Sequence, residues 1–394
     1  MLTRKLTKMS FDFDSPANRR GTNCYKWDID APEEDVIPLW VADMDFAVAP
    51  KIVEALQRRL NHHVYGYTKV PKSFYDAITN WYARRYNWHV EADWIVYTIG
   101  VVPAVAAIIK SLEGDGCGIL MQTPAYNCFF SCINNSHCHL VENKLVRTED
   151  SYEIDWEDFE AKAALPDTKI FLLCNPHNPT GRVWTPDELR RMGDICLRHG
   201  VTVIADEIHY GITMPGYTYT PYASLGDKYR DNCIQTASCS KSFNIAGLQI
   251  AYIIASNPNL REGVDRAINI NETCDVNPFG VEALQAAYNE CEDWLAEFCL
   301  YIKGNYDFLV SEFAAHMPSV KAMRLEGTYL AWLDCRSLGM PSQYLGAKLL
   351  KEAKVRVSAG DMYGEPDGYM RINLACPREQ LAEGVRRMIA CLNK

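Results

Sequence analysis

The chain has 394 residues, of which 48% are hydrophobic, so it is long enough for about two to three domain-sized units with a sizeable core. Forty basic residues against fifty acidic ones give a net charge of −10, which argues against nucleic acid or an anionic membrane as partner and favours small molecules. No apolar h-region follows the first ten residues, and the longest apolar stretch, 101–109, is far below the roughly 18 residues that a membrane span needs. The fifteen cysteines have no framework spacing, so we expect a reduced, cytoplasmic protein.

The first 50 or so residues are rich in Asp and Pro and have no long periodic run. From about residue 94 to 255 one theme repeats, in which a short apolar run is followed by a turn and then by residues with helical spacing. The predicted strands are 94–99, 118–122, 169–174, 201–205, 233–238 and 250–255. Because such apolar runs are typical of strands covered on both faces, we expect a mainly parallel sheet wrapped by helices.

One helix start is clearly marked, because Thr185, Pro186 and Glu188 supply the N-cap, N1 and N3 positions of a capping box. After about residue 290 the pattern changes to a long helical segment, 292–315, which strands near 328–334 and 368–374 follow. A closing helix is expected to carry Pro377 in its first turn. The predicted division is an N-terminal segment, 1–55, that belongs with a smaller α+β domain, 291–394, and a large α/β domain, 56–290.

Ligands of a doubly wound sheet bind beyond the carboxyl ends of its strands, so the residues after each run are candidates for a site. Gly100, Val101 and Val102 follow the first run at a predicted helix start, where free N–H groups favour an anion such as phosphate, although a glycine there is also an ordinary turn device. Tyr126 follows the second run and either presents its ring to the cleft or packs on the helix. Asn178 lies in the stretch NPHNPTG, which must turn and which holds two amide side chains.

The last two strand ends carry charge. Asp206 follows the run 201–205, where a buried carboxylate needs a cationic or protonated partner, unless it is a helix N-cap. Lys241 follows the run 233–238 and stands beside Ser240, two residues after Ser238. Alone it would be a surface lysine. Together the strand ends offer an amine for a Schiff base, an acid for a ring nitrogen and an anion site, which is what pyridoxal phosphate needs.

A second group of residues contains metal-ligand types but no matching pattern. It consists of Cys128, Cys132, His137, Cys138 and His139. Its spacing corresponds to no closed zinc motif, so we predict free thiols and no metal.

The whole chain resembles the fold-type I pyridoxal-phosphate enzymes of the aminotransferase class I/II superfamily, and within it the MalY/PatB branch of cystathionine β-lyases and cystalysin-like C–S lyases. The motifs that carry the resemblance are PLWVADMDF (38–46), YGYT (65–68), TGRVW (180–184), DEIH (206–209), SKSFNIAGLQ (240–249), EGTYLAW (326–332) and YMRINLACP (369–377). The resemblance implies the aspartate aminotransferase fold, with a large, mainly parallel α/β domain and a smaller α+β domain.

The resemblance also implies roles for single residues. Lys241 forms the Schiff base with pyridoxal 5'-phosphate, Asp206 pairs with the pyridine nitrogen, Asn178 hydrogen-bonds the phenolic oxygen and Tyr126 stacks on the ring. The phosphate group is expected on Gly100, Val101, Val102, Ser238 and, from the other subunit of a homodimer with active sites at the subunit interface, Tyr67. Ser240 is a further expected cofactor-binding residue. The substrate α-carboxylate is expected on Arg371 and on the backbone N–H of Ala42, with Trp40 at the border of the pocket.

Two positions depart from the aminotransferase pattern. His209 stands where transaminases usually place a tyrosine near the phenolic oxygen, and Gln249 stands where they place an arginine on the phosphate. Both changes occur in the lyase branch, so the resemblance implies α,β-elimination of L-cystathionine or related cysteine S-conjugates to pyruvate, ammonia and a thiol. An aminotransferase acting on an L-amino acid and a cofactor-binding regulatory protein without turnover remain alternatives.

Overall fold

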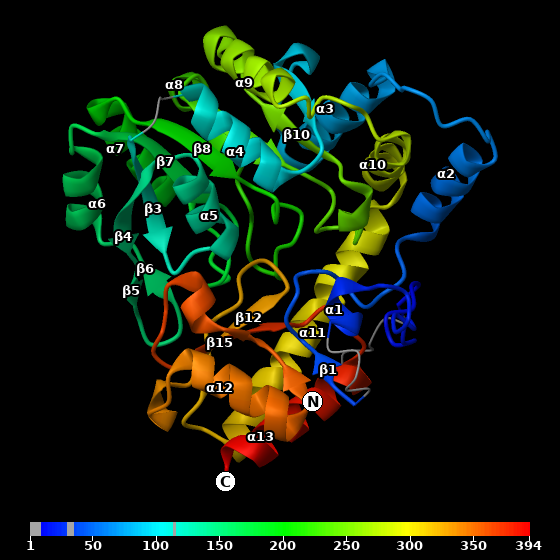
Figure 1. Cartoon of the computed structure of the whole chain (residues 1–394), viewed down its shortest axis with the longest axis vertical. Helices are drawn as coiled ribbons and strands as arrows, with labels where there is room; N and C mark the ends of the chain where they lie inside the picture. Colours follow the sequence, from blue (N-terminus) through cyan, green and yellow to red (C-terminus); the bar gives the residue numbers. More distant parts are fainter. Residues whose placement is uncertain (1–8, 30–34, 113–115) are drawn as a thin grey trace.

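The computed structural model describes residues 9–29, 35–112 and 116–394. Its largest sheet has seven strands in the order β2-β10-β9-β8-β7-β3-β4 (Figure 1). The strands are β2 (Ile95–Thr98), β3 (Gly118–Thr123), β4 (His139–Lys144), β7 (Thr168–Cys174), β8 (Thr202–Asp206), β9 (Cys233–Ala237) and β10 (Ala251–Ile254). Strand β10 runs antiparallel to both of its neighbours, and the other pairs are parallel. The prediction of a mainly parallel sheet is confirmed.

All six predicted strands are present, and their ends lie within one residue of the predicted ends. The sequence did not predict β4, whose residues alternate between exposed and buried positions. An edge strand of this kind contains no continuous apolar run, which is the signal that revealed the other strands.

Helices cover both faces of the sheet. On one face lie α4 (Val101–Leu112), α5 (Asn127–Asn135) and α9 (Pro258–Ile270), and on the other lie α6 (Trp156–Ala163), α7 (Pro186–His199) and α8 (Asp227–Arg230). Strand β7 shows why its sequence is apolar throughout, because Ile170 and Leu172 pack on the first face while Phe171 and Leu173 pack on the second. The predicted capping box of α7 is confirmed by reciprocal hydrogen bonds between Thr185 and Glu188.

A smaller antiparallel sheet forms in the C-terminal part of the chain. Its order is β11-β12-β15-β14, from β11 (Lys321–Ala322), β12 (Leu330–Asp334), β15 (Tyr369–Asn373) and β14 (Ser358–Ala359). The helices here are α11 (Glu292–His316), α12 (Ser342–Lys348) and α13 (Arg378–Leu392). Helix α13 begins at Arg378, so the placement of Pro377 in the first turn was wrong; its ψ of 144° is extended, and it stands at the N-cap.

The N-terminal residues join this smaller part of the molecule. Strand β1 (Ile37–Pro38) pairs in parallel with β13 (Val355–Arg356), and α1 (Tyr25–Asp28) lies close to it (Figure 1). Helices α2 (Pro50–Leu60) and α3 (Lys72–Tyr86) pack against α10 (Pro278–Glu290). The pairing of β1 with β13 joins the N-terminal residues to the C-terminal part of the chain, while the division into 1–55, 56–290 and 291–394 stays a prediction.

The remaining elements are short. Strands β5 (Val146–Arg147) and β6 (Tyr152–Glu153) form an antiparallel pair. Every cysteine lies within the described ranges, and none of them forms a disulfide bond. Within the same ranges, no helix has the length and apolar character that crossing a membrane would take.

Candidate active site

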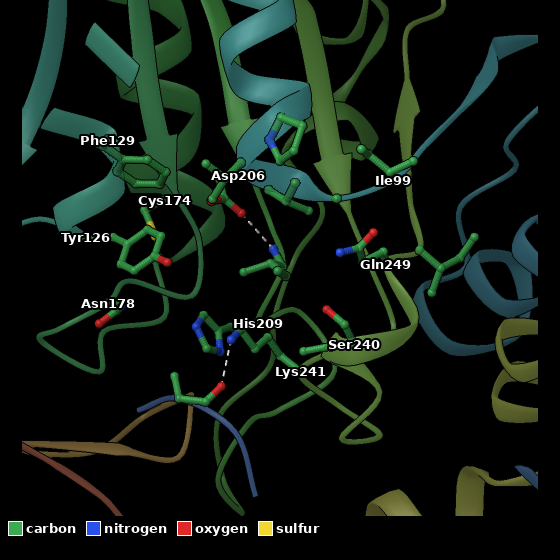
Figure 2. Close-up of a pocket in the computed structure, with 18 residues that line it drawn as sticks. Ile99, Tyr126, Phe129, Cys174, Asn178, Asp206, His209, Ser240, Lys241 and Gln249 are labelled. Atoms are coloured by element: carbon green, nitrogen blue, oxygen red, sulfur yellow. Dashed lines mark hydrogen bonds between the residues drawn. The ribbon is translucent and has the colours of Figure 1, made fainter. Parts of the chain in front are cut away.

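A cavity lies at the carboxyl ends of the parallel strands, where the sequence predicts the site (Figure 2). The predicted residues that line it are Ala42, Gly100, Val101, Val102, Tyr126, Asn178, Asp206, His209, Ser240, Lys241 and Gln249. They come from strand ends far apart in the chain, which the doubly wound topology brings to one edge.

Lys241 follows β9, and its side chain is partly buried. The Nζ atom donates a hydrogen bond to the carbonyl oxygen of Ala42 at 2.6 Å. Burial lowers the pKa of the Lys241 amine to about 8; the charge of Arg371 acts in the same direction, and the carboxylates of Asp43 and Asp206 act against it. The amine is therefore available in its neutral, nucleophilic form near neutral pH.

Asp206 ends β8 and is 3% exposed. Its Oδ1 accepts a hydrogen bond from the Ile208 N–H at 3.0 Å. Burial raises the pKa of this carboxyl to about 7, with a smaller opposing effect from the charge of Lys241. The neighbouring Glu207 accepts hydrogen bonds from the Tyr219 hydroxyl and the Tyr222 N–H, so it is already satisfied. Asp206 is therefore the carboxylate in the cavity wall that is available to pair with a cationic group.

Arg371 in β15 reaches the cavity edge through Asn178. Its Nη1 donates to Asn178 Oδ1 at 3.0 Å, and its Nη2 donates to the carbonyl oxygen of Trp40 at 2.9 Å. The guanidinium lies 4.8 Å from the centre of the Tyr363 ring. Such a held, planar fork suits bidentate binding of a carboxylate.

Trp40 contributes to the site through its backbone carbonyl, which accepts the hydrogen bond from Arg371. Its ring packs beside Tyr25 and under the Arg356 guanidinium, and its Nε1 donates to the carbonyl oxygen of Lys26. The ring is thus engaged with the N-terminal residues, and among the described residues the cavity wall does not include it.

The rings of His209 and Tyr329 lie close together, with their centroids 6.0 Å apart. The His209 ring is buried, and its Nδ1 has no hydrogen-bond partner among the described residues. Burial lowers the pKa of His209 well below its usual range, with the charges of Lys241 and Arg371 acting the same way, so the imidazole is neutral. Tyr329, which the sequence reasoning did not single out, donates its hydroxyl to the Ala42 carbonyl at 2.8 Å. Its only sequence signal was its place in EGTYLAW.

The expected phosphate end is built from neutral groups. Gly100, Val101 and Val102 stand at the N-terminus of α4, where backbone N–H groups lack helical acceptors. The Ser238 hydroxyl donates to the carbonyl oxygen of Ile250 and accepts from the Ser240 N–H. Of these two serines, Ser240 lines the cavity. Gln249 also lines this end. Over the described part of the chain, Lys241 is the only cation in the cavity wall.

Tyr67 lies outside the cavity of its own chain and is 99% exposed. Val64 and Tyr65 nearby are also exposed. A row of exposed apolar side chains is what a contact with a second copy requires, so the role of Tyr67 in a partner's site stays a prediction. The cysteine and histidine group contains no metal-binding cluster, and neither does any other part of the described ranges.

Comparison with known proteins agrees with this geometry. Residues 34–388 match the family described as aminotransferase class I and II. The chain belongs to this family. It is 37% identical over 386 residues to cystathionine beta-lyase PatB of Bacillus subtilis, covering 97% of this chain and 100% of PatB, and 35% identical to Protein MalY of Escherichia coli, covering 96% and 98%. Its structure matches cystalysin from Treponema denticola with a TM-score of 0.95 and 33% identity over 98% of this chain and 99% of cystalysin.

These likenesses place this aminotransferase class I/II chain in the MalY/PatB branch and confirm the predicted fold type I. The cystalysin structure contains a pyridoxal 5'-phosphate cofactor. The residues of this chain fit the same group on their own evidence. The buried Asp206 and the His209 ring, whose Nδ1 has no hydrogen-bond partner in the described part of the chain, line the same cavity as Lys241 (Figure 2).

Proposed function

We propose that the protein is a pyridoxal-phosphate-dependent C–S β-lyase that cleaves L-cystathionine or related cysteine S-conjugates to pyruvate, ammonia and a thiol. The observation that carries the proposal is that the Lys241 amine and the buried Asp206 carboxylate lie in the wall of one cavity. Two groups in one cavity whose pKa values are shifted toward neutrality are typical of a catalytic site. The names of PatB and cystalysin support the reaction class.

Each residue has a separate task in this proposal. The chemistry that pyridoxal phosphate supplies when bound is electron withdrawal from the substrate α-carbon, which lets a group on Cβ leave. Lys241 holds the cofactor and, once displaced by the substrate amine, takes the proton from the α-carbon as general base. Asp206 holds a proton on the pyridine nitrogen, where its negative charge in a dry site is most effective.

Substrate binding falls to Arg371 and Asn178. Their hydrogen bond keeps the guanidinium in place before the substrate arrives. The Ala42 carbonyl is already bound by Lys241 and Tyr329, which leaves its N–H side for the carboxylate. We infer that the substrate carboxylate binds the Arg371 fork, with the amide of Ala42 as a further donor.

The choice of elimination over transamination rests on His209 and Gln249. A neutral imidazole beside Lys241 carries no acidic hydroxyl, and Gln249 brings no charge to the phosphate end. Relatives that are named as lyases support the same choice. The homodimer, with Tyr67 of each subunit at the phosphate end of the other site, completes the proposal, because the chain's own lining there is neutral.

Incubation of the purified protein, supplied with pyridoxal phosphate, with L-cystathionine tests the reaction. We expect pyruvate, ammonia and a thiol to form in equal amounts without any added 2-oxo acid. Pyruvate is measured by coupled reduction and the thiol by a chromogenic disulfide. A strict requirement for a 2-oxo acid, with amino-group transfer to it, would contradict the lyase and favour the aminotransferase.

A further inference from the structure

The acceptor of Lys241 belongs to a backbone segment whose carbonyl oxygens are all bound by distant side chains. This segment is 40–44. The donors are Arg371 and Ser358 to Trp40, Asn373 to Val41, Lys241 and Tyr329 to Ala42, Asn373 and Lys26 to Asp43, and Asn244 and Arg19 to Met44. The position of the Ala42 oxygen therefore depends on the groups that hold its neighbours.

Two of these donors come from the N-terminal arm, residues 9–29, and form an ionic cluster with Asp43 and Asp45. Arg19 bridges both carboxylates, with Nη2 at 2.6 Å from Asp43 Oδ2 and Nη1 at 2.8 Å from Asp45 Oδ1. Lys26, whose side chain is fully buried, lies 2.8 Å from Asp45 Oδ2 and 3.7 Å from Asp43 Oδ1. Two cations and two carboxylates balance, which a buried cluster needs.

The carboxylate of Asp43 binds Arg19 of the arm and also acts electrostatically on the active site. Arg19 binds Oδ2, while Oδ1 is buried and has no hydrogen-bond partner among the described residues. Asp43 directly follows Ala42, whose oxygen holds the Lys241 amine. Its negative charge acts on both Lys241 and the Tyr329 hydroxyl beside the same oxygen.

The other charged and titratable groups that face Lys241 come from separate elements. They are Asp206 at the end of β8, His209 in the turn after it, Cys128 in α5 and Arg371 in β15. Of the carboxylates, Asp43 has the strongest effect in keeping a proton on the Lys241 nitrogen, ahead of Asp206. Arg19 is the group that offsets Asp43 at hydrogen-bond distance.

We propose that Arg19 is a positioning residue of the active site: by binding the Asp43 carboxylate and the Met44 carbonyl, it holds the Ala42 oxygen in place for Lys241 and partly neutralises the carboxylate of Asp43. This inference rests on the proposed cofactor linkage at Lys241. The arm itself is anchored elsewhere, since Phe13 packs with Phe46 and Trp294 in the core. The role of Arg19 can therefore be tested separately from the attachment of the arm to the core.

The test uses the full-length holoenzyme and the visible absorbance of the bound cofactor as a function of pH. The midpoint of that titration reports the proton on the Lys241 nitrogen. In Arg19→Gln only Lys26, 3.7 Å from Asp43 Oδ1, still offsets the Asp43 charge, so we expect the midpoint to rise by about 0.5–1 pH unit. In Asp43→Asn the charge is removed, so the midpoint falls by a similar amount. Arg19→Lys, which keeps a cation, should lie between Arg19→Gln and the unmodified protein.

Arg20→Gln is the matched control on the same arm. Arg20 donates to the carbonyl oxygen of Val36 at 2.6 Å and lies over the Trp27 ring, and it has no acidic partner within the described ranges. Its loss should leave the midpoint unchanged. A merely structural role for Arg19 would lower thermal stability in Arg19→Gln and Arg20→Gln alike, without opposite shifts of the midpoint.

The outcomes separate this inference from the proposed function. If the unmodified protein shows no pH-dependent visible absorbance, the proposed function fails. If it does, and the Arg19→Gln and Asp43→Asn midpoints stay in place or move in the same direction, the role of Arg19 is overturned. Should Arg19→Gln fail to fold, Asp43→Asn decides: a lower midpoint supports the inference and an unchanged one overturns it.

Discussion

Replacing Lys241 with alanine is expected to abolish turnover while the chain still folds and retains affinity for pyridoxal phosphate. The amine is the proposed nucleophile and the general base, and burial has already brought its pKa to about 8, so no neighbour carries the same two properties. Loss of both tasks should lower kcat by roughly 10⁴-fold or more. The measurement is the rate of pyruvate release from L-cystathionine at saturating substrate, with far-ultraviolet circular dichroism as the check on folding.

Lys303→Ala provides the control for this experiment. Lys303 lies on the exposed side of α11 and pairs with Asp307, so its removal should leave kcat within about twofold of the unmodified rate. A Lys241→Ala protein that keeps more than about a tenth of the original rate would assign the chemistry to another group.

Replacing Asp206 with asparagine has two expected effects of opposite sign. Turnover should fall by roughly 10²-fold or more, because the amide cannot hold a proton on the cofactor's ring nitrogen by charge. The cofactor-free chain, in contrast, should become more stable at high pH. The Asp206 carboxyl is buried, and at pH 8.5 the original side chain is charged there without the partner that the cofactor would provide.

The direction of the stability change follows from the raised pKa of Asp206. Its pKa is about 7 in the folded chain and 3.8 in the unfolded one, so the folded state binds more protons between these values. The contribution of Asp206 to folding stability therefore decreases as pH rises from about 4 to about 7. Above pH 7 the charged, buried carboxylate destabilises the fold to its full extent. Asparagine removes the penalty but buries an amide, so the net gain at pH 8.5 should be roughly 1–3 kcal/mol.

Thermal or urea unfolding of the cofactor-free protein at pH 5 and pH 8.5 checks this expectation. The difference between Asp206→Asn and the unmodified chain should be larger at pH 8.5 than at pH 5. Asp194→Asn is the control, because the pKa of this carboxyl is shifted in the opposite direction. The hydrogen bond from Lys228 lowers the pKa of Asp194, so replacing Asp194 should give no stabilisation. If the Asp206→Asn chain unfolds more easily than the unmodified chain at pH 8.5, the charge of Asp206 stabilises the fold, which contradicts this expectation.

The sequence predicted the parts of the site that lie directly at strand ends. Lys241, Asp206 and Asn178 each follow an apolar run, and parallel strands bring such residues to one edge of the sheet. The fold could be predicted for the same reason, since strands buried on both faces are apolar along their whole length. Strand β4 was missed because it lies at an edge and alternates.

The parts that sequence reasoning missed depend on contacts between distant residues. Tyr329 and Asp43 are ordinary by local pattern, and only the fold places the Tyr329 hydroxyl on the Ala42 carbonyl and Arg19 on Asp43. Trp40 was expected at the border of the substrate pocket; in the structure its carbonyl oxygen accepts a hydrogen bond from Arg371, while its ring packs beside Tyr25. Backbone groups of this kind carry no residue-type signal, so only the structure reveals them.

The covalent site of the cofactor tests the central claim most directly. The purified protein is loaded with pyridoxal phosphate, reduced with borohydride, digested and analysed by peptide mass spectrometry. The account predicts that the yellow colour bleaches and that the phosphopyridoxyl group is found on the peptide that contains Lys241, in close to one equivalent per chain. A colourless protein, or a label on any other lysine with Lys241 unmodified, would contradict it.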